Sequence, residues 1–400
     1  TLKGSLWNKV ECKKHLSHKS QMSNKKHIDC IFTLLQSSLG DFIPNFSFEN
    51  IEWQSVFKLA MQHGVAALCL DGIQKIEKMK NDSVSSLIPS TKQCKLQWIG
   101  AVMQQERQFA KQLQVLKQLS LFCNKNNIKM MLLKGYGCSL NYPIPNHRPC
   151  GDIDIYLYGK GGFADMLINK EYGITSKQNE DKHSTFVFNG IVVENHALII
   201  NTAIHPQLCE LEEYFEKEAE NAIEMEMRDG SFYIPSVNMN ALFLAYHTAS
   251  HFCKDEANIR QLCDWATFIQ RNGKNIDWKF VERLAKQSGF FKFFCCLNGI
   301  IQDNLGVASE LLPNWERNKD LEQNVVMSIV YPKFVGHLSV SAKLKRFFAN
   351  KWKYNMVYNE SLCQHFVLLA KSYYRTKIDK NAKSIWEKKN HDLEDVMKKY

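Results

Sequence analysis

Two aspartates, Asp152 and Asp154, are separated by one residue in the segment GDIDIYLY. The segment opens by alternating acidic with apolar residues and ends in β-rich residues, which predicts a strand. Residues at positions i and i+2 of a strand point to the same face. Two carboxylates held that close repel each other unless a cation lies between them, and hard oxygen ligands favour Mg²⁺ or Mn²⁺. The spacing therefore indicates a divalent-cation site, although two exposed acids at a strand end would give the same pattern.

A third acid, Glu194, interrupts the apolar runs 191–193 and 197–200. Burying an unpaired carboxylate costs several kcal/mol unless it is paired or binds a metal. If this segment packs beside the Asp152 strand, three carboxylates converge, which is a ligand set for two metal ions that bridge a triphosphate during in-line displacement. His196 shares the strand face of Glu194, either as a partner that orients the carboxylate or as a half-buried core residue. Glu194 could also end a strand in water.

Three residues upstream could bind phosphate. Lys134 and Gly135 follow the apolar run 128–133, where a short helix is expected to begin. A helix N-terminus with a small residue lets backbone N–H groups reach phosphate oxygens, and a lysine adds a point charge. Arg148, in the Pro- and Gly-containing loop 143–151, could brace the same phosphates through two parallel hydrogen bonds. A plain tight turn at Gly135 is the alternative, and the order of the motifs is more specific than any one of them.

The elements that must position these residues form a compact α/β module. Asn189-Gly190, between two β-rich runs, is the strongest signal for a tight hairpin. The module's expected elements are a strand at 128–133, a turn and short helix at 134–142, a strand at 152–158, a helix at 161–173 closed by Gly173, and the hairpin.

Helical segments are expected on both sides of this module, so the predicted fold class is α+β with a small mixed sheet. Apolar spacing is helical from residue 28, with a break near Gly64, and again after Pro235, where Ser236 is the expected cap. The expected regions are a polar basic arm (1–27), a helical region (28–127), the α/β core (128–235), a helical region that closes the cleft (236–330) and a basic helical region (331–400).

The run LLKGYGCSLNYPIPNHRPCGDIDIYL resembles the DNA polymerase β-like nucleotidyltransferase superfamily. It is most similar to an uncharacterised bacterial nucleotidyltransferase family whose core reads roughly L-K-G, Y-P and R-x-x-x-D-I-D. The helical stretch EWQSVFKLAMQHGVAALCL, the ENH triplet and the later H-x-x-x-H and R-x-x-C-D segments fit the same family. The superfamily usually has Gly-Ser where this chain has Lys134-Gly135.

The resemblance implies a polymerase β-like mixed sheet with helices packed on one face. It implies Mg²⁺ or Mn²⁺ bound by Asp152, Asp154 and Glu194. The residues expected to bind the nucleotide, with ATP among the candidates, are Lys134, Gly135, Tyr136, Ser139 and Arg148.

The expected activity is transfer of an NMP group from an NTP to an acceptor hydroxyl with release of pyrophosphate. The acceptor is left open between a small molecule, a protein and RNA, and the oligomeric state is also open. One alternative is a catalytically inactive nucleotide- or RNA-binding protein on the same fold. Another is a phosphodiesterase or nuclease that uses the same metals.

Further candidates lie on two later helices. His247 and His251 are four residues apart on one helix face, and Asp264 lies on the next helix. Two histidines and an aspartate could bind zinc, or these side chains could line the cleft. Arg260 and Asp264 could equally form a salt bridge along their own helix.

Charge and composition set wider limits. The net charge is +10, and residues 333–400 hold fifteen Lys and Arg against six Asp and Glu. This basic stretch, interleaved with Trp352, Tyr354, Tyr373, Tyr374 and Trp386, either faces water or binds a polyanion. No G-x-S-x-G elbow and no P-loop occur, which disfavours a serine hydrolase and a P-loop NTPase.

Thirteen scattered cysteines without a C-x-x-C pair predict free thiols in a reducing cytoplasm rather than a disulfide framework. There is neither a secretory signal nor an apolar run of transmembrane length, so a cytoplasmic protein without membrane association is expected.

Overall fold

The computed structural model describes residues 25–40, 45–79, 92–179, 183–228, 230–336 and 338–374. The chain divides into two compact units, Thr1–Gln104 with Gln302–Gly306, and Gln105–Ile301 with Val307–Tyr400. Most of the expected basic arm lies outside the described residues, and its described residues, 25–27, are helical.

The described part of the first unit is helical, as the apolar spacing predicted. Its helices are 25–39, α2 (Trp53–Gln62), α3 (Ala66–Met79) and the first part of α4 (Lys92–Lys125). The expected break near Gly64 separates α2 from α3, and this glycine has φ +65°. Trp98 of α4 is fully buried, and its indole Nε1 donates to the carbonyl of Ala66 over 2.7 Å. That hydrogen bond joins α4 to the start of α3.

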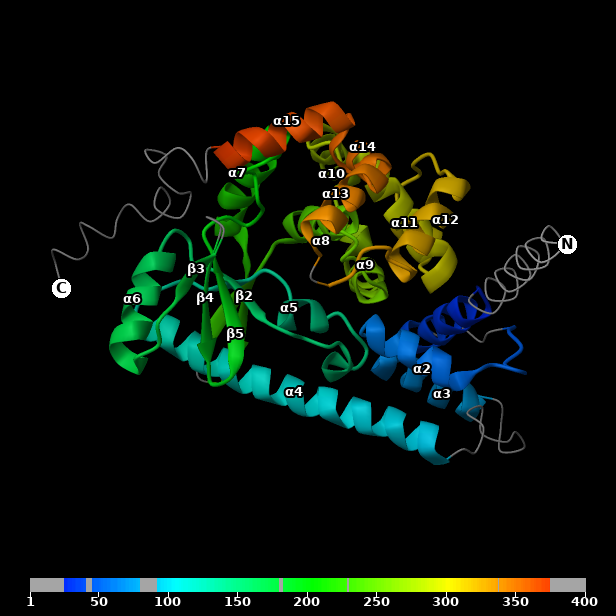
Figure 1. The fold of residues 1–400 in the computed structure, drawn as a ribbon. Helices are drawn as coiled ribbons and strands as arrows, with labels where there is room; N and C mark the ends of the chain where they lie inside the picture. Colours follow the sequence, from blue (N-terminus) through cyan, green and yellow to red (C-terminus); the bar gives the residue numbers. More distant parts are fainter. Residues whose placement is uncertain are drawn as a thin grey trace, which may run out of the picture. The chain divides into compact units, whose positions relative to one another are not determined.

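The second unit is built on a seven-stranded mixed sheet of order β3-β4-β5-β2-β1-β7-β6. Strands β2, β3, β4 and β5 are labelled in Figure 1. Two pairs, β2 with β5 and β1 with β7, are parallel, and the others are antiparallel. The strands are β1 (Met131–Leu132), β2 (Ile153–Tyr156), β3 (Lys177–Asn179), β4 (His183–Phe188), β5 (Ile191–His196), β6 (Ile223–Met227) and β7 (Gly230–Ile234). The expected α+β class with a mixed sheet is confirmed, but the sheet is larger than expected.

One face of the sheet packs against α4 and α6 (Gly161–Tyr172). Leu119 and Phe122 of α4 and Ile168 of α6 belong to the same buried cluster as Ile153 and Ile155 of β2. Side chains alternate between the two faces of a strand. Because the isoleucines of β2 face the helices, Asp154 faces the opposite side of the sheet.

The hairpin at Asn189-Gly190 is confirmed. Asn189 has φ +48° and Gly190 φ +76°, and β4 and β5 pair in full antiparallel register around them. Positive φ at both central residues is what a type I′ turn requires. Gly173 likewise has φ +66° and ends α6 where predicted.

The remaining helices are short 3₁₀ turns and α-helices. They are α5 (Tyr136–Ser139), η1 (Pro145–His147), η2 (Pro206–Leu208), α7 (Cys209–Glu218), η3 (Ala219–Asn221), α8 (Val237–Cys253), α9 (Ile259–Asn272), η4 (Gly273–Asn275), α10 (Trp278–Gln287), α11 (Phe291–Leu305), η5 (Ser309–Leu311), α12 (Lys319–Val330), α13 (Val340–Ala349), α14 (Lys351–Tyr358) and α15 (Leu362–Tyr373). Ser236 precedes α8 as predicted, but its hydroxyl does not cap the helix; it donates to Glu218 Oε1 over 2.7 Å.

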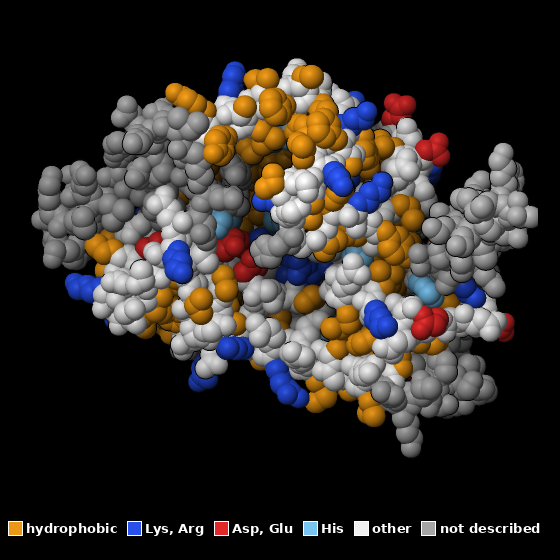
Figure 2. Space-filling model, in the orientation of Figure 1, with side chains coloured by type: hydrophobic (Ala, Val, Ile, Leu, Met, Phe, Trp, Pro, Cys, Tyr) orange, Lys and Arg blue, Asp and Glu red, His pale blue; other side chains and the backbone are white. Residues whose placement is uncertain are grey.

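The described part of the basic C-terminal region is partly a packed core. Lys353 is 2% exposed, and its Nζ lies 2.6 Å from Asp255 Oδ1. Tyr354 is also buried. Hydrophobic side chains gather over α15, where Phe366 and Val367 are exposed (Figure 2). Of the aromatic residues predicted to alternate with basic ones here, Trp386 lies outside the described residues.

In the described ranges, no helix is long and apolar enough to cross a membrane. The cysteines in these ranges are free thiols, and all but Cys209, Cys295 and Cys363 are buried.

Candidate active site

Strands β2 and β5 bring two of the three predicted carboxylates together. They are parallel neighbours, and Asp154 pairs with Glu194 in their register. The ring of His196, two residues further along β5, reaches both acids: its Nε2 lies 3.0 Å from Asp154 Oδ1 and 3.5 Å from Glu194 Oε2. One ligand atom from each of these residues lies within 4.8 Å of the others. Asp154, Glu194 and His196 therefore form the acidic cluster of the sheet.

Asp154 is the most buried member of the acidic cluster. Its side chain is fully buried, and Lys134 Nζ lies 3.0 Å from its Oδ1. Burial alone would raise the pKa of this carboxyl, but Lys134 and His196 outweigh burial and hold the pKa well below its usual range. Burial similarly acts to lower the pKa of His196, but hydrogen bonding to Asp154 and Glu194 raises it overall. The acids are thus held in their charged form.

The acidic cluster fits a divalent cation. Asp154 Oδ2 is buried and has no hydrogen-bond partner, whereas Oδ1 is shared by Lys134 and His196. Leaving a buried carboxylate oxygen unpaired is costly, so such an atom calls for a ligand. Two carboxylates suit Mg²⁺ or Mn²⁺, and an imidazole among the donors is compatible with Mn²⁺.

Asp152 is less closely associated with the cluster. It is half-buried and is absent from the group of ligand atoms within 4.8 Å of one another. Burial, followed by repulsion from the Asp154 carboxylate, raises its pKa. Strand β2 begins at Ile153, so Asp152 lies in the loop just before it. The aspartates are therefore neighbours, but only Asp154 is held by strand pairing.

Two cavities meet at this side of the sheet. The acidic cluster opens into a cavity of about 360 Å³, here named the metal-side cavity. A second cavity of about 350 Å³, the loop-side cavity, is lined by Gly135, Arg148, Gly151 and residues of α8 and α9. The residues that line both are Lys134, Asp152, His247, His251 and Glu256. Lys134 and Asp152 thus lie where the two cavities adjoin.

Arg148 lines the loop-side cavity, but its guanidinium is engaged by protein. Its Nε and Nη2 donate to the two oxygens of Asp264, each over 2.8 Å, and its Nη1 donates to the carbonyl of Pro149. Tyr142 Oη donates to Asp264 Oδ1 over 2.6 Å. Asp264 is therefore paired with Arg148, whereas Arg260 donates to Pro149 O. The network ties loop 143–151 to α9.

The remaining nucleotide candidates differ in their surroundings. Gly135 has φ +67°, which L side chains rarely adopt, and lines the loop-side cavity. Tyr136 instead contacts Phe109 and Phe232. Ser139 is fully buried, and its hydroxyl donates to Tyr136 O. Among these three residues, Gly135 has the clearest access to a ligand.

Each residue predicted to line the cleft lines at least one of the two cavities. His196 lines the metal-side cavity, Arg260 and Asp264 line the loop-side cavity, and His247 and His251 line both. The described residues hold no metal-ligand cluster of His247, His251 and Asp264, because Asp264 is taken by Arg148 and Tyr142.

Sequence reasoning missed two residues near the site. Glu256 lines both cavities, and its Oε2 lies 3.3 Å from His251 Nδ1. His183 of β4 is paired with His196 in the register, and its Nε2 lies 4.0 Å from Glu194 Oε1. His183 could have been found by counting back from the Asn-Gly turn, because antiparallel pairing fixes its neighbour.

The sequence matches, over residues 49–306, the family described as uncharacterised nucleotidyltransferase. This is well over half of the chain, so the protein belongs to that family, and the resemblance to an uncharacterised nucleotidyltransferase family is confirmed. None of the curated proteins matches the chain. Among solved structures, an antigenic nucleotidyltransferase-like protein from Paracoccidioides brasiliensis aligns with a TM-score of 0.33 and 8% identity, covering 51% of this chain and 97% of that one. A similarity this low supports no further conclusion.

Proposed function

We propose that the protein is a metal-dependent nucleotidyltransferase that moves an NMP group from an NTP to an acceptor hydroxyl and releases pyrophosphate. The observation that carries the proposal is the acidic cluster, in which a buried oxygen of Asp154 lacks a partner beside Glu194. Membership of a nucleotidyltransferase family supports the same reaction class.

In this proposal Asp154 and Glu194, with Asp152 beside them, hold the divalent cation. When bound, the cation offsets the charge of the triphosphate and of the departing pyrophosphate. His196 keeps Asp154 and Glu194 in place through its contacts of 3.0 and 3.5 Å. These carboxylates are fixed by strand pairing, so they need little reorganisation during the reaction.

Lys134 and Gly135 are the residues that bind the phosphates. The ammonium of Lys134 lies at the boundary of both cavities, next to Asp154. Gly135 lacks a Cβ, so backbone N–H groups can approach a phosphate closely. Arg148 acts indirectly, because its bond to Asp264 fixes the loop that carries Gly151 and Asp152.

The test is a thermal-shift titration with Mn²⁺ and each NTP, followed by transfer from NTPs labelled at the α-phosphate. A ligand at about 100 times its Kd stabilises the folded state by about 2.7 kcal/mol. The wild-type protein is expected to respond to the metal and an NTP together. Asp154→Asn and Glu194→Gln should abolish the response, and both keep the side-chain volume.

Asp320→Asn, at an exposed position in the first turn of α12, is the matched control and should respond like the wild type. An equal response from folded Asp154→Asn and Glu194→Gln would refute the site. Binding without any transfer would instead favour an inactive nucleotide-binding protein.

A further inference from the structure

His205 forms one wall of the metal-side cavity and lies outside the acidic cluster. It lies directly before η2, is 5% exposed and lines the cavity together with Glu194. Its Nδ1 lies 2.8 Å from Glu360 Oε1, although 155 residues separate the two in sequence. The ring also stacks on Tyr358 at a centroid distance of 3.5 Å. These contacts fix the orientation of the imidazole.

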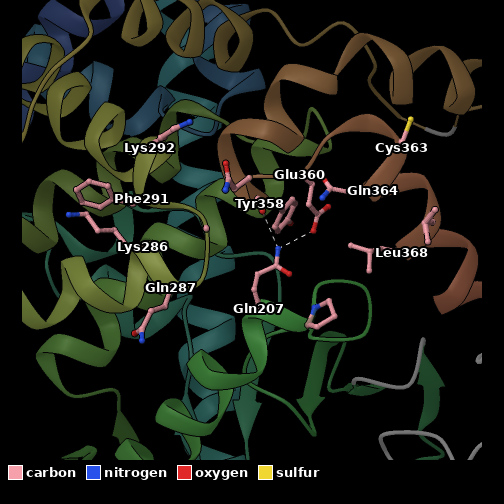
Figure 3. A pocket seen from close by; sticks show the side chains of 14 residues that line it. Gln207, Lys286, Gln287, Phe291, Lys292, Tyr358, Glu360, Cys363, Gln364 and Leu368 are labelled. Atoms are coloured by element: carbon pink, nitrogen blue, oxygen red, sulfur yellow. Dashed lines mark hydrogen bonds between the residues drawn. The ribbon is translucent and has the colours of Figure 1, made fainter.

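Glu360 is held as firmly as His205. Gln207 Nε2 donates to its Oε1 over 3.0 Å and to the carbonyl of Tyr358 over 3.2 Å (Figure 3). His365 Nδ1 lies 2.9 Å from its other oxygen. Burial would raise the pKa of this carboxyl, but the hydrogen bonds from His205, His365 and Gln207 lower it to about 2. Glu360 is therefore an ionised acceptor.

The bond to Glu360 determines which nitrogen of His205 faces the cavity. Because a carboxylate only accepts, Nδ1 carries the proton and Nε2 carries the lone pair. Among the described residues Nε2 of His205 has no hydrogen-bond partner. It is also absent from the fully buried atoms that lack a partner, so it is accessible. The ring lines the metal-side cavity, so Nε2 is open to it.

Several charged groups surround the ring. Burial lowers the pKa of His205, Glu360 raises it, and His365 and Lys254 lower it further, with a net shift below the usual value. Glu360 precedes α15, His365 lies on α15, and Lys254 follows α8. His205 is thus neutral at neutral pH and able to accept a proton.

The walls of the metal-side cavity carry polar and apolar side chains in about equal measure. The apolar ones include Leu198, Ile200, Ile204, Phe243, Tyr246 and Tyr358, and Asn201 and Ser250 are neutral polar groups. A volume of about 360 Å³ suits a small molecule rather than a folded polymer. Among the described residues that line this cavity, the lysines are Lys254 and Lys134. Such a cavity favours a small acceptor over a polymer such as RNA.

We propose that the metal-side cavity binds a small alcohol as the acceptor, and that His205, oriented by Glu360, takes the proton of its hydroxyl. This proposal rests on the proposed nucleotidyltransferase activity. The acceptor oxygen forms a bond to the α-phosphorus of the NTP, and the bond from that phosphorus to the bridging oxygen breaks. Pyrophosphate leaves with the bond electrons, and the hydroxyl proton passes to Nε2 of His205.

The test measures Mn²⁺-dependent transfer from α-labelled NTP to a panel of aliphatic and aromatic alcohols and, separately, to RNA ending in a 3′-hydroxyl. His205→Gln is expected to lower kcat/KM for the alcohol by at least about 100-fold, the usual loss of a general base. It should leave the Mn²⁺–NTP thermal shift intact. His365→Gln is the matched control, because it removes the other partner of Glu360 without lining the cavity.

The pH profile of Glu360→Gln distinguishes a proton-accepting His205 from a merely structural one. Losing the carboxylate charge makes protonated His205 less stable, so the acidic limb of the kcat/KM profile should move to lower pH. His365→Gln should retain at least a tenth of the wild-type kcat/KM.

The outcomes separate the two proposals. Absence of any metal- and NTP-dependent transfer by the wild type would overturn the proposed function. Alcohol labelling with folded His205→Gln as active as His365→Gln, or an unmoved acidic limb in Glu360→Gln, would overturn the role of His205. Labelling of RNA in preference to every alcohol would overturn the acceptor class.

Discussion

Arg148 and Asp264 were predicted separately, one for phosphate and the other for the cleft or a helix salt bridge, but they bind each other. The pair is buried and bidentate, with both N–O distances at 2.8 Å. Breaking a buried pair leaves an uncompensated charge, which costs about 3–5 kcal/mol. Arg148→Met should therefore lower the free energy of unfolding in urea by that amount. The double variant Arg148→Met/Asp264→Leu should recover at least half of the loss; equal destabilisation of both would contradict this account.

Glu212 supports the wall of the metal-side cavity. Its two carboxylate oxygens accept from the backbone N–H groups of Ile199 and Ile200, each over 2.8 Å. Glu212→Ala leaves both donors without this acceptor, which should cost about 2–5 kcal/mol in urea unfolding. Glu212→Gln retains one acceptor oxygen and should cost about half as much. A loss below about 1 kcal/mol for Glu212→Ala would show that water replaces the carboxylate.

The Glu360 carboxyl should make stability depend on acid pH. Its pKa is about 2 in the folded protein and ordinarily 4.5, so folding depresses it. A depressed pKa contributes stability above pH 4.5 that is lost as the pH falls toward 2. The contribution is about 3 kcal/mol. The difference in unfolding free energy between wild type and Glu360→Gln should therefore shrink as the pH falls from about 4.5 to about 2; a constant difference would contradict the shift.

At the scale of elements, the Asn189-Gly190 turn sets the register of β4 against β5, which places His183 opposite His196 in the hairpin that carries Glu194. Gly190 has φ +76°, where a residue with a Cβ is strained by about 1–2 kcal/mol. Gly190→Ala should lower the unfolding free energy by that amount. A Cβ there would approach only the flexible end of Lys111, so backbone strain is the main cause. Asn189→Gly tolerates the same φ and should stay within about 0.5 kcal/mol, which a thermal or urea melt can check.

The sequence predicted the elements whose signals are local. The Asn-Gly turn and the helix ended by Gly173 appear where expected. The strand expected at 152–158 is shorter, Ile153–Tyr156, and leaves Asp152 outside it. The apolar pattern overestimated the length of β1. The strand was expected at 128–133, but only Met131–Leu132 pairs with neighbouring strands, and the rest of the run lies outside the strand. It missed β6 and β7, although the Asp229-Gly230 pair between them is a typical turn sequence. A short exposed strand has little apolar alternation to reveal it.

Contacts between distant segments could not be predicted. Asp154 and Glu194 were expected to meet only if the hairpin packed beside the strand with the aspartates, and no local pattern showed that it would. The bond between His205 and Glu360 depends on how the C-terminal helices return to the sheet, and no local pattern encodes that path. The same holds for Arg148 and Asp264, whose residue types alone suggested ligand binding. Only the structure shows which charged residues pair with each other and which remain candidate ligands.

At the scale of the whole molecule, every residue that lines the two cavities belongs to the second unit. A ligand that binds only the folded site stabilises the unit that contains it. Amide hydrogen exchange follows local unfolding, so it measures this stabilisation separately in each unit. Mn²⁺ with an NTP should therefore slow amide hydrogen exchange in β2, β5 and α8 by at least tenfold. Exchange in α2 and α3 of the first unit should change by less than twofold.

Asp154→Asn provides the control in the same exchange experiment, because the metal and NTP should then no longer slow exchange in β2 and β5 relative to the same variant without ligand. Equal protection of α2 and α3 would show that the ligand's effect extends to the first unit, contrary to the prediction. Protection in the second unit that persists in Asp154→Asn would place the ligand away from the acidic cluster. Because exchange is read segment by segment, one titration tests both the location of binding and the independence of the units.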